Sequence, residues 1–223
     1  MRYNSSKTSA AARFLRVCGR PLKRWLTVRP GSALHPNEPL PLSQLIYPLR
    51  YDIVIRREFF AMLAANHELF QRDFAAFFEL AKSHAYYVWF RSIACPLRMR
   101  RILHSELAID EAYAGRVRQA ESLYTSFRQR GFDEMHPILL KSGLAVCATA
   151  SGRYRRQPYY AGDGCHRLAL LLLEGYESVP AEYYHVMYLP IYRPWDVSSW
   201  LLESLETGSP DYDACRSALE QWN

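Results

Sequence analysis

The stretch Gly162–Gly175, GDGCHRLALLLLEG, decides much of the fold. Two glycines flank Asp163 and predict a sharp turn, because glycine adopts backbone conformations that other residues avoid. The apolar run Leu168–Leu173 follows, and it is too short to span a bilayer. The pattern therefore predicts a buried helix that begins after the turn and ends at Gly175.

The same turn carries the residues of a phosphate site. A helix N-terminus presents free N–H groups and a dipole that favour an anion, and Gly162 and Gly164 permit close approach of a ligand. His166 and Arg167 lie in the first helical turn, where cations can contact the same anion. Asp163 is placed to accept a proton or to hold a divalent metal against phosphates. The alternative is a tight strand-to-helix turn with a helix-capping aspartate, and spacing alone does not separate the two interpretations.

Cys165 is the candidate nucleophile of this segment. It lies at the helix N-terminus beside His166 and Arg167, where greater thiolate character is expected. The neighbouring Asp163 adds negative charge, which opposes thiolate formation. The alternative is that Cys165 is only a small residue that fits the turn.

The segments around the turn alternate between helical and extended patterns. Apolar residues at helical spacing predict a helix over 110–130 that Gly131 ends, with Asp110 and Glu111 at its N-terminus. Short apolar pieces predict strands, at 137–141, 159–161 and 178–187. After Trp195 the sequence predicts one or two amphipathic helices separated by the turn TGSP.

The first half of the chain is harder to assign. Leu42–Ile55 mixes β-branched and aromatic residues and contains Pro48, which predicts a short strand, a turn and a second extended piece. From Arg56 to Ser83, phenylalanines recur on one helical face, which favours core packing over a binding platform. His84–Phe90, HAYYVWF, fits either a strand or a buried helix.

Charge is unevenly distributed along the 223 residues. Eight of the 28 basic residues precede Pro30 and no acidic residue precedes Glu38, which leaves 20 basic against 22 acidic residues elsewhere. The net charge of +6 therefore belongs to an N-terminal arm (1–38). Such an arm fits contact with nucleic acid or an anionic membrane, an organelle transit peptide, or a solvated tail. The remainder divides into a domain at 39–190, with a helical insertion at about 56–109, and a helical tail at 191–223.

The five cysteines and seven histidines argue against two kinds of site. The cysteines form no C-x-x-C pair and the histidines no H-x-x-x-H pair, so neither a disulfide framework nor a zinc site is indicated. Such cysteine usage suits a reducing compartment, and we expect a cytoplasmic protein.

GDGCHR and its flanks resemble the ParB/sulfiredoxin superfamily. LPLSQLIYPLRYDI (40–53) resembles the opening strand and turn of that fold, FRQRGFDEMHPILLKSG (127–143) a helix and strand, and 159–186 the nucleotide box. Cys165, His166 and Arg167 match the sulfiredoxin motif, in which the cysteine attacks a phosphorylated sulfinate and the His and Arg bind ATP phosphates. Asp163, Gly164, His166 and Arg167 match the D-G-H-H-R box of free-serine kinases, with Cys165 in place of the first His.

The departures from the family favour its kinase-like branch. Asp163 replaces the small residue of the sulfiredoxin motif, and the 56–109 insertion has no counterpart in a minimal sulfiredoxin. The Glu-Arg-Arg box and helix-turn-helix domain of chromosome-partitioning ParB proteins are not evident. The resemblance implies an α+β fold with a small mixed sheet, packed helices and an insertion that shapes the acceptor pocket.

The implied function is a nucleotide-binding phosphotransferase that acts on a small molecule with ATP or ADP and Mg²⁺. The expected phosphate contacts are Gly162, Gly164, His166 and Arg167. Asp163 or Asp52 would be the base or the metal ligand, and Arg50 would contact the acceptor. The alternatives are a sulfiredoxin-like ATP-dependent reductase that uses Cys165, and a non-catalytic module that binds nucleotide or nucleic acid.

Overall fold

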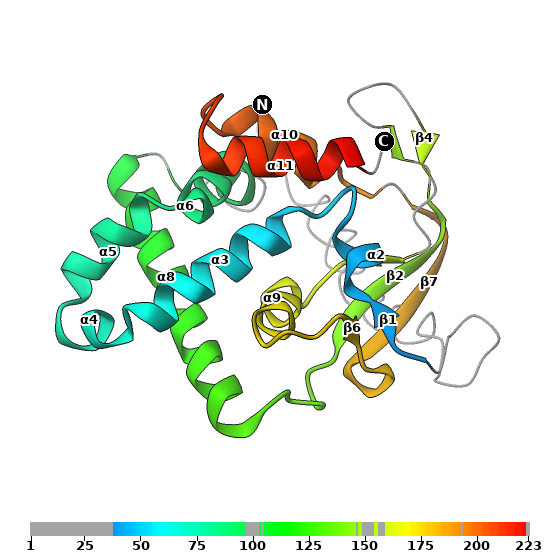
Figure 1. Cartoon of the computed structure of the whole chain (residues 1–223), viewed down its shortest axis with the longest axis horizontal. Helices are drawn as coiled ribbons and strands as arrows, with labels where there is room; N and C mark the ends of the chain where they lie inside the picture. The colour runs from blue at the N-terminus through cyan, green and yellow to red at the C-terminus, as the bar shows by residue number, and fades with distance from the viewer. Residues whose placement is uncertain are drawn as a thin grey trace, which may run out of the picture.

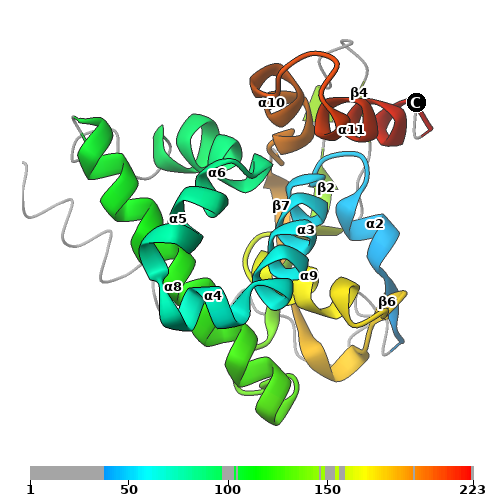
Figure 2. The same cartoon turned by 60° about the vertical axis from the view of Figure 1, so that its left-hand side comes forward.

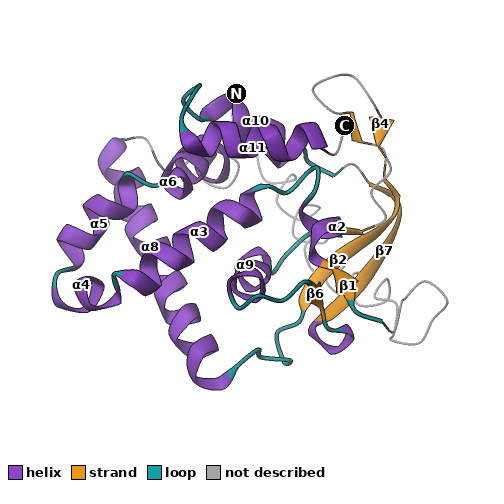
Figure 3. Cartoon of the chain, in the orientation of Figure 1, coloured by secondary structure: helices purple, strands orange, loops and turns teal. Residues whose placement is uncertain are grey.

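A computed structural model describes residues 38–96, 103, 105–145, 147–148, 154–155, 159–192 and 194–221. Within them the chain is an α+β protein, as predicted, and most of the helices lie on one side of a small sheet (Figures 1 and 3). Nearly all of the basic arm (1–38) lies outside the described residues, so its contact with nucleic acid or a membrane stays a prediction.

The central sheet has the strand order β5–β2–β7. The middle strand β2 (Ile138–Ala145) pairs antiparallel with β5 (Tyr159–Ala161) and parallel with β7 (Tyr184–Tyr192), so the predicted mixed sheet is confirmed. Two further antiparallel pairs join β1 (Leu40–Pro41) to β6 (Ser178–Val179) and β3 (Cys147–Ala148) to β4 (Tyr154–Arg155).

The single strand predicted at 178–187 is wrong in its extent. β6 ends at Val179, and a 3₁₀-helix η2 (Ala181–Tyr183) separates it from β7. Pro180 lies at the break, where its missing N–H cannot take part in strand pairing. The chain can therefore turn from the edge of one sheet into the next.

The helix predicted after the glycine turn is α9 (Cys165–Leu173). It lies between the sheet and the long helix α3 (Asp52–Ala65), as Figures 1 and 2 show from two sides. Residues 168–171 of α9 are buried there. Burial of this apolar run against both neighbours holds the turn before α9 in the middle of the molecule.

The opening segment 42–55 differs from the prediction. Only β1 is extended, and it is followed by α2 (Leu42–Ile46) and then by α3, so the second extended piece is wrong. Ile53 and Ile55 are fully or almost fully buried together with Phe59, Phe60 and Leu63 of the same helix. This tertiary burial outweighs the preference of β-branched residues for strands. As a result, Asp52 lies in the first turn of a helix.

The described part of the insertion is mainly helical. Its further elements are α4 (His67–Arg72), α5 (Phe74–Lys82), α6 (Ala85–Trp89), the π-helix η1 (Phe90–Ala94) and the start of α8 (Glu106–Arg130). Every phenylalanine of 56–96 is buried or packs against the core, which confirms the core interpretation. HAYYVWF is therefore a buried helix.

The boundaries of α8 are partly as predicted. Gly131 ends it, but the helix begins at Glu106, because the Ser105 hydroxyl caps the Ala108 N–H at 3.2 Å. The prediction that Asp110 and Glu111 form its N-terminus is wrong.

The C-terminal helices are α10 (Val197–Ser204) and α11 (Pro210–Gln221), as the sequence predicts. Val197, Leu201 and Cys215 are buried in the same hydrophobic cluster as α3 and α9. The Ser198 hydroxyl accepts a hydrogen bond from the Tyr51 N–H at 2.8 Å, which ties α10 to the start of α3. In the part of the chain that the structure describes, no helix is both long and apolar enough to cross a membrane.

Candidate functional site

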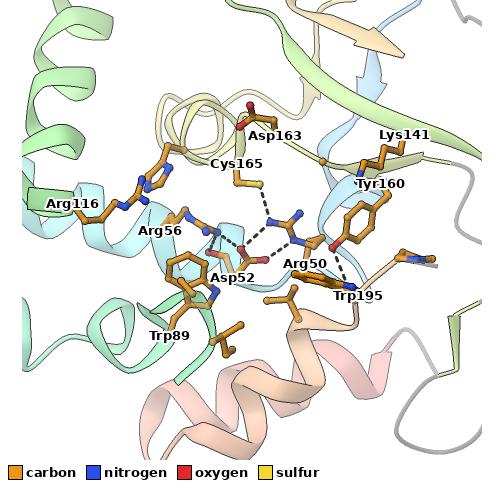
Figure 4. Close-up of a pocket in the computed structure, with 16 residues that line it drawn as sticks. Arg50, Asp52, Arg56, Trp89, Arg116, Lys141, Tyr160, Asp163, Cys165 and Trp195 are labelled. Carbon is orange, nitrogen blue, oxygen red and sulfur yellow. Dashed lines mark hydrogen bonds and ion pairs between the residues drawn. The ribbon is translucent and has the colours of Figure 1, made fainter. Parts of the chain in front are cut away.

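A cavity of about 430 Å³ lies where the N-terminal ends of α3 and α9 meet (Figure 4). Its walls also include parts of α6, η1, α8, β2 and the start of α10. The charged side chains that line it are the cations Arg50, Arg56, Arg116 and Lys141 and the carboxylates Asp52 and Asp163. The four cations outnumber the two carboxylates, and His166 and Cys165 also line the cavity. The cavity is therefore suited to an anion.

The glycine turn is held by hydrogen bonds to β2. The N–H groups of Gly162 and Asp163 donate to the Leu139 carbonyl at 2.9 and 3.2 Å, and the Gly164 N–H donates to Asp163 Oδ1 at 2.7 Å. Because these donors already have partners, the prediction that the Gly162 and Gly164 amides hold phosphate is not supported. The feature of this segment that still favours an anion is the positive end of the α9 helix dipole, at residues 165–167.

Each glycine of the turn has a steric role. Gly164 has φ +84°, and a Cβ there would lie 3.1 Å from the Ile138 Cα, so the close approach is to β2 rather than to a ligand. A Cβ at Gly162 would lie 2.9 Å from Cε of Lys141. Gly162 therefore leaves room for the Lys141 side chain to lie across the turn and line the cavity.

Arg50 connects the turn to the start of α3. Its Nη2 donates to Cys165 Sγ at 2.8 Å, and its Nη1 donates to the carbonyl of Ala161, the last residue of β5. The Arg50 side chain is buried and carries its charge directly to the sulfur. Cys165 itself is half-buried and lines the cavity. Sequence analysis assigned Arg50 to an acceptor, whereas the structure places it against the candidate nucleophile.

Asp52 is enclosed by two arginines. Arg50 Nε donates to its Oδ1 at 2.8 Å and Arg50 Nη2 to its Oδ2 at 3.0 Å, while Arg56 Nη1 also donates to Oδ2. Burial alone would raise the pKa of Asp52, but the two guanidinium groups outweigh it and lower the pKa to about 2. Such a carboxylate is a poor proton acceptor, and its oxygens are already engaged. The structure therefore favours a structural role for Asp52 over that of base or metal ligand.

The cluster of Arg50, Asp52 and Arg56, called the arginine cluster below, extends to an aromatic wall. The Arg56 guanidinium lies 4.0 Å from the centroid of the Trp89 ring, a cation–π geometry. From the sequence, Trp89 is ambiguous between pocket and core, with core favoured; in the structure it is buried and also lines the cavity. Arg56 is a site residue that the sequence analysis missed.

His166 lies in the cavity wall and Arg167 does not. His166 Nε2 is 2.6 Å from the Tyr86 hydroxyl, and its ring meets Phe60 and Tyr86 edge-on. Arg167 is absent from the lining residues, and its Nη1 is buried without a hydrogen-bond partner among the described residues. Of the two cationic phosphate contacts expected from the sequence, His166 therefore lines the cavity and Arg167 does not.

Asp163 is the exposed carboxylate of the cavity. Its Oδ1 accepts the Gly164 N–H, and the side chain points away from the arginine cluster in Figure 4. Within the described residues, no three His, Cys, Asp or Glu side chains are grouped to hold a metal ion. A single carboxylate such as Asp163 is compatible with Mg²⁺. Nucleotide-bound magnesium usually takes one or two protein carboxylates and completes its coordination with phosphate oxygens and water.

Three further cavity residues come from distant elements: Arg116 of α8, Lys141 of β2 and Trp195 before α10. Figure 4 places Lys141, Tyr160 and Trp195 at one end of the site and Arg56, Trp89 and Arg116 at the other. Lys141 lies in the 127–143 stretch that resembles the superfamily, but nothing in that stretch marks it as a site residue. The fold is what brings these three residues to the cavity.

Comparisons of the chain with protein-family models, with curated proteins and with solved structures found no match. Any assignment of function therefore rests on the resemblance of the 162–167 motif and on the chemistry of the cavity.

Proposed function

We propose that the cavity binds the phosphates of a nucleotide and supports phosphoryl transfer to a small-molecule acceptor. The observation that carries the proposal is that Arg50, Arg56, Arg116 and Lys141 line one cavity, whose wall includes the N-terminus of α9. Four cations from three segments, the start of α3, α8 and β2, line the cavity with two carboxylates. They form an excess of positive charge that suits a polyanion. The match of 163–167 to the kinase box is a second, independent support.

Each cavity residue would have a role that follows from its position. Lys141 and the positive end of the α9 dipole would bind the phosphates, and His166 would contribute a further polar contact. Arg50, whose nitrogens already donate to Asp52, Ala161 and Cys165, would add positive charge beside them. Asp163 would hold the accompanying Mg²⁺, which would supply charge neutralisation. Because phosphoryl transfer depends mainly on positioning and charge stabilisation, these contacts could supply most of the catalysis.

The helical insertion would form the acceptor side. Trp89, Ile93 and Ala94 line the cavity together with Arg116. These residues form a mixed apolar and cationic wall, which suits a small organic acceptor that carries an anionic group.

Calorimetric titration of the protein with ATP and ADP, with Mg²⁺ present, tests the proposal. Lys141→Ala should weaken binding by about 1.5–3 kcal/mol, the range for a hydrogen bond to a charged group. Arg128→Ala is the matched control, because Arg128 is exposed and pairs with Glu174 on the outer surface. Absence of nucleotide binding, or equal binding by Lys141→Ala, would reject the proposal.

Arg167→Ala tests the resemblance separately. The superfamily motif implies a phosphate contact for Arg167 and a loss of similar size, whereas the cavity geometry implies little direct effect. A loss equal to that of Lys141→Ala would show that Arg167 reaches the phosphates when nucleotide is bound.

One observation favours a second function, the sulfiredoxin-like reductase. Arg50 Nη2 donates to Cys165 Sγ at 2.8 Å, and Cys165 lines the cavity, so a cation lies beside the sulfur that a reductase would use as its nucleophile. A reductase would lose all activity in Cys165→Ser, while a phosphotransferase would retain most of its nucleotide turnover. The same variant therefore separates the two functions.

A further inference from the structure

Two exposed tryptophans lie beside the mouth of the cationic cavity. Trp195 is 52% exposed and Trp200 is 40% exposed, and their ring centroids are 6.1 Å apart. Trp195 also lines the cavity. Isolated apolar residues on a surface are ordinary, but two large aromatic rings in contact at the entrance of a charged cavity are suited to a ligand.

Trp195 is held in place relative to the phosphate end of the cavity. The Tyr160 hydroxyl donates to the Trp195 carbonyl at 3.3 Å. The Arg50 guanidinium in turn lies 5.1 Å from the centroid of the Tyr160 ring. Arg50, Tyr160 and Trp195 therefore form a chain of contacts, and Figure 4 shows them on the same side as Lys141. The indole of Trp195 thus lies on the same side of the cavity as the cations Arg50 and Lys141.

We infer that Trp195, supported by Trp200, stacks on the base of the nucleotide while its phosphates occupy the cavity. This inference rests on the proposed function and names the part of the site that would hold the base. A ligand with a flat aromatic ring joined to phosphates fits an indole face beside arginine and lysine. An acceptor without a ring would leave the indole of Trp195 in water.

The same geometry predicts weak selection between bases. The described residues that line the cavity include no Asn, Gln, Ser or Thr, and the proposal assigns Lys141 to the phosphates and Asp163 to Mg²⁺. Neither Lys141 nor Asp163 is then left to read the edge of a base. Stacking tolerates every base, because each has a similar π-face. The site should therefore bind ATP and GTP with similar affinity.

The test compares ATP, GTP and inorganic tripolyphosphate by calorimetric titration of the full chain with Mg²⁺. In the unmodified protein, ATP and GTP should bind roughly 5- to 150-fold more tightly than tripolyphosphate, the range that one stacked base contributes. Trp195→Ala should abolish most of this difference and leave tripolyphosphate affinity unchanged. Trp195→Phe should retain much of it, and Trp200→Ala should lose less than Trp195→Ala.

The controls separate the inference from the function on which it rests. Lys141→Ala should weaken ATP and tripolyphosphate alike, and circular dichroism should show that each variant folds. Equal affinity of the unmodified protein for ATP and tripolyphosphate would overturn the base site but keep the phosphate site. Equal weakening of both ligands by Trp195→Ala would also overturn it. Failure of all three ligands to bind would overturn both proposals.

Discussion

The cavity has two aspartates in contrasting surroundings. Asp52 lies in the arginine cluster, is 1% exposed and is engaged by two guanidinium groups. Asp163 lies in the glycine turn, is exposed and accepts only the N–H of the next residue among its described contacts. The comparison shows that the hydrogen-bond and ion-pair partners of a carboxylate near Cys165 decide whether it can also bind a ligand or a metal ion. Asp52 is committed to the structure, and Asp163 remains available to a ligand.

Asp52→Ala should give the largest effect on stability. Removing the carboxylate leaves Arg50 and Arg56 buried side by side with no counter-charge, and breaking a buried ion pair in this way costs about 3–5 kcal/mol. Urea unfolding followed by circular dichroism measures the loss. Asp213→Ala, at an exposed first-turn aspartate of α11, is the matched control and should change stability by less than about 0.5 kcal/mol. Equal stability of the two variants would contradict the structural role of Asp52.

Asp163→Asn should give the largest effect on turnover without loss of stability. The asparagine oxygen can still accept the Gly164 N–H, but the negative charge that would hold Mg²⁺ is lost. We expect nucleotide turnover to fall by a factor of about 10², the scale for a positioned catalytic group. Cys165→Ser should keep most of the turnover. An active Asp163→Asn together with an inactive Cys165→Ser would replace the phosphotransferase by the thiol-dependent reductase.

The glycine turn could be predicted from sequence because its signals are local. Gly162, Gly164 and the apolar run after Cys165 lie within one short stretch, and a turn followed by a buried helix satisfies all of them. What the stretch could not reveal is where the amides donate. The hydrogen bonds to Leu139 depend on how β2 lies beside the turn, which is a tertiary property.

The arginine cluster could not be predicted because the helix containing it was assigned to the wrong class. Asp52 and Arg56 are four residues apart, a spacing that brings side chains together only on a helix. The β-branched residues at 53–55 indicated an extended segment, and burial against α9 overrode them. Lys141 was predicted only as part of a strand, and Trp195 only as the start of a helical tail. They reach the cavity through the packing of β2 and α10.

The pKa of Asp52 gives a pH test of the same cluster. Its pKa of about 2 lies below the ordinary value of 3.8, so the folded protein binds fewer protons at this site than the unfolded chain. The resulting stabilisation, about 2 kcal/mol, should be complete above about pH 4 and be lost as the pH falls towards 2. Carbon-13 NMR titration of the aspartate carboxyl groups, combined with urea unfolding at each pH, measures both quantities. A carboxyl at Asp52 that titrates at or above 3.8 would contradict the arginine cluster.

The smallest expected effect is a difference in stability between alanine substitutions at Gly164 and Gly175. This comparison tests the packing of the glycine turn and leaves its charged side chains unchanged. Gly164 and Gly175 both have positive φ, +84° and +81°, so alanine is strained at either position. They differ in space: a Cβ at Gly164 would lie 3.1 Å from the Ile138 Cα, while nothing lies within 4 Å of one at Gly175. Gly164→Ala should therefore be less stable than Gly175→Ala by about 1–2 kcal/mol, because the backbone of β2 must shift as well. Thermal or urea unfolding of the two variants measures this difference directly. If both lose the same stability, the turn does not press against β2, and the position of Cys165 at the cavity would need another explanation.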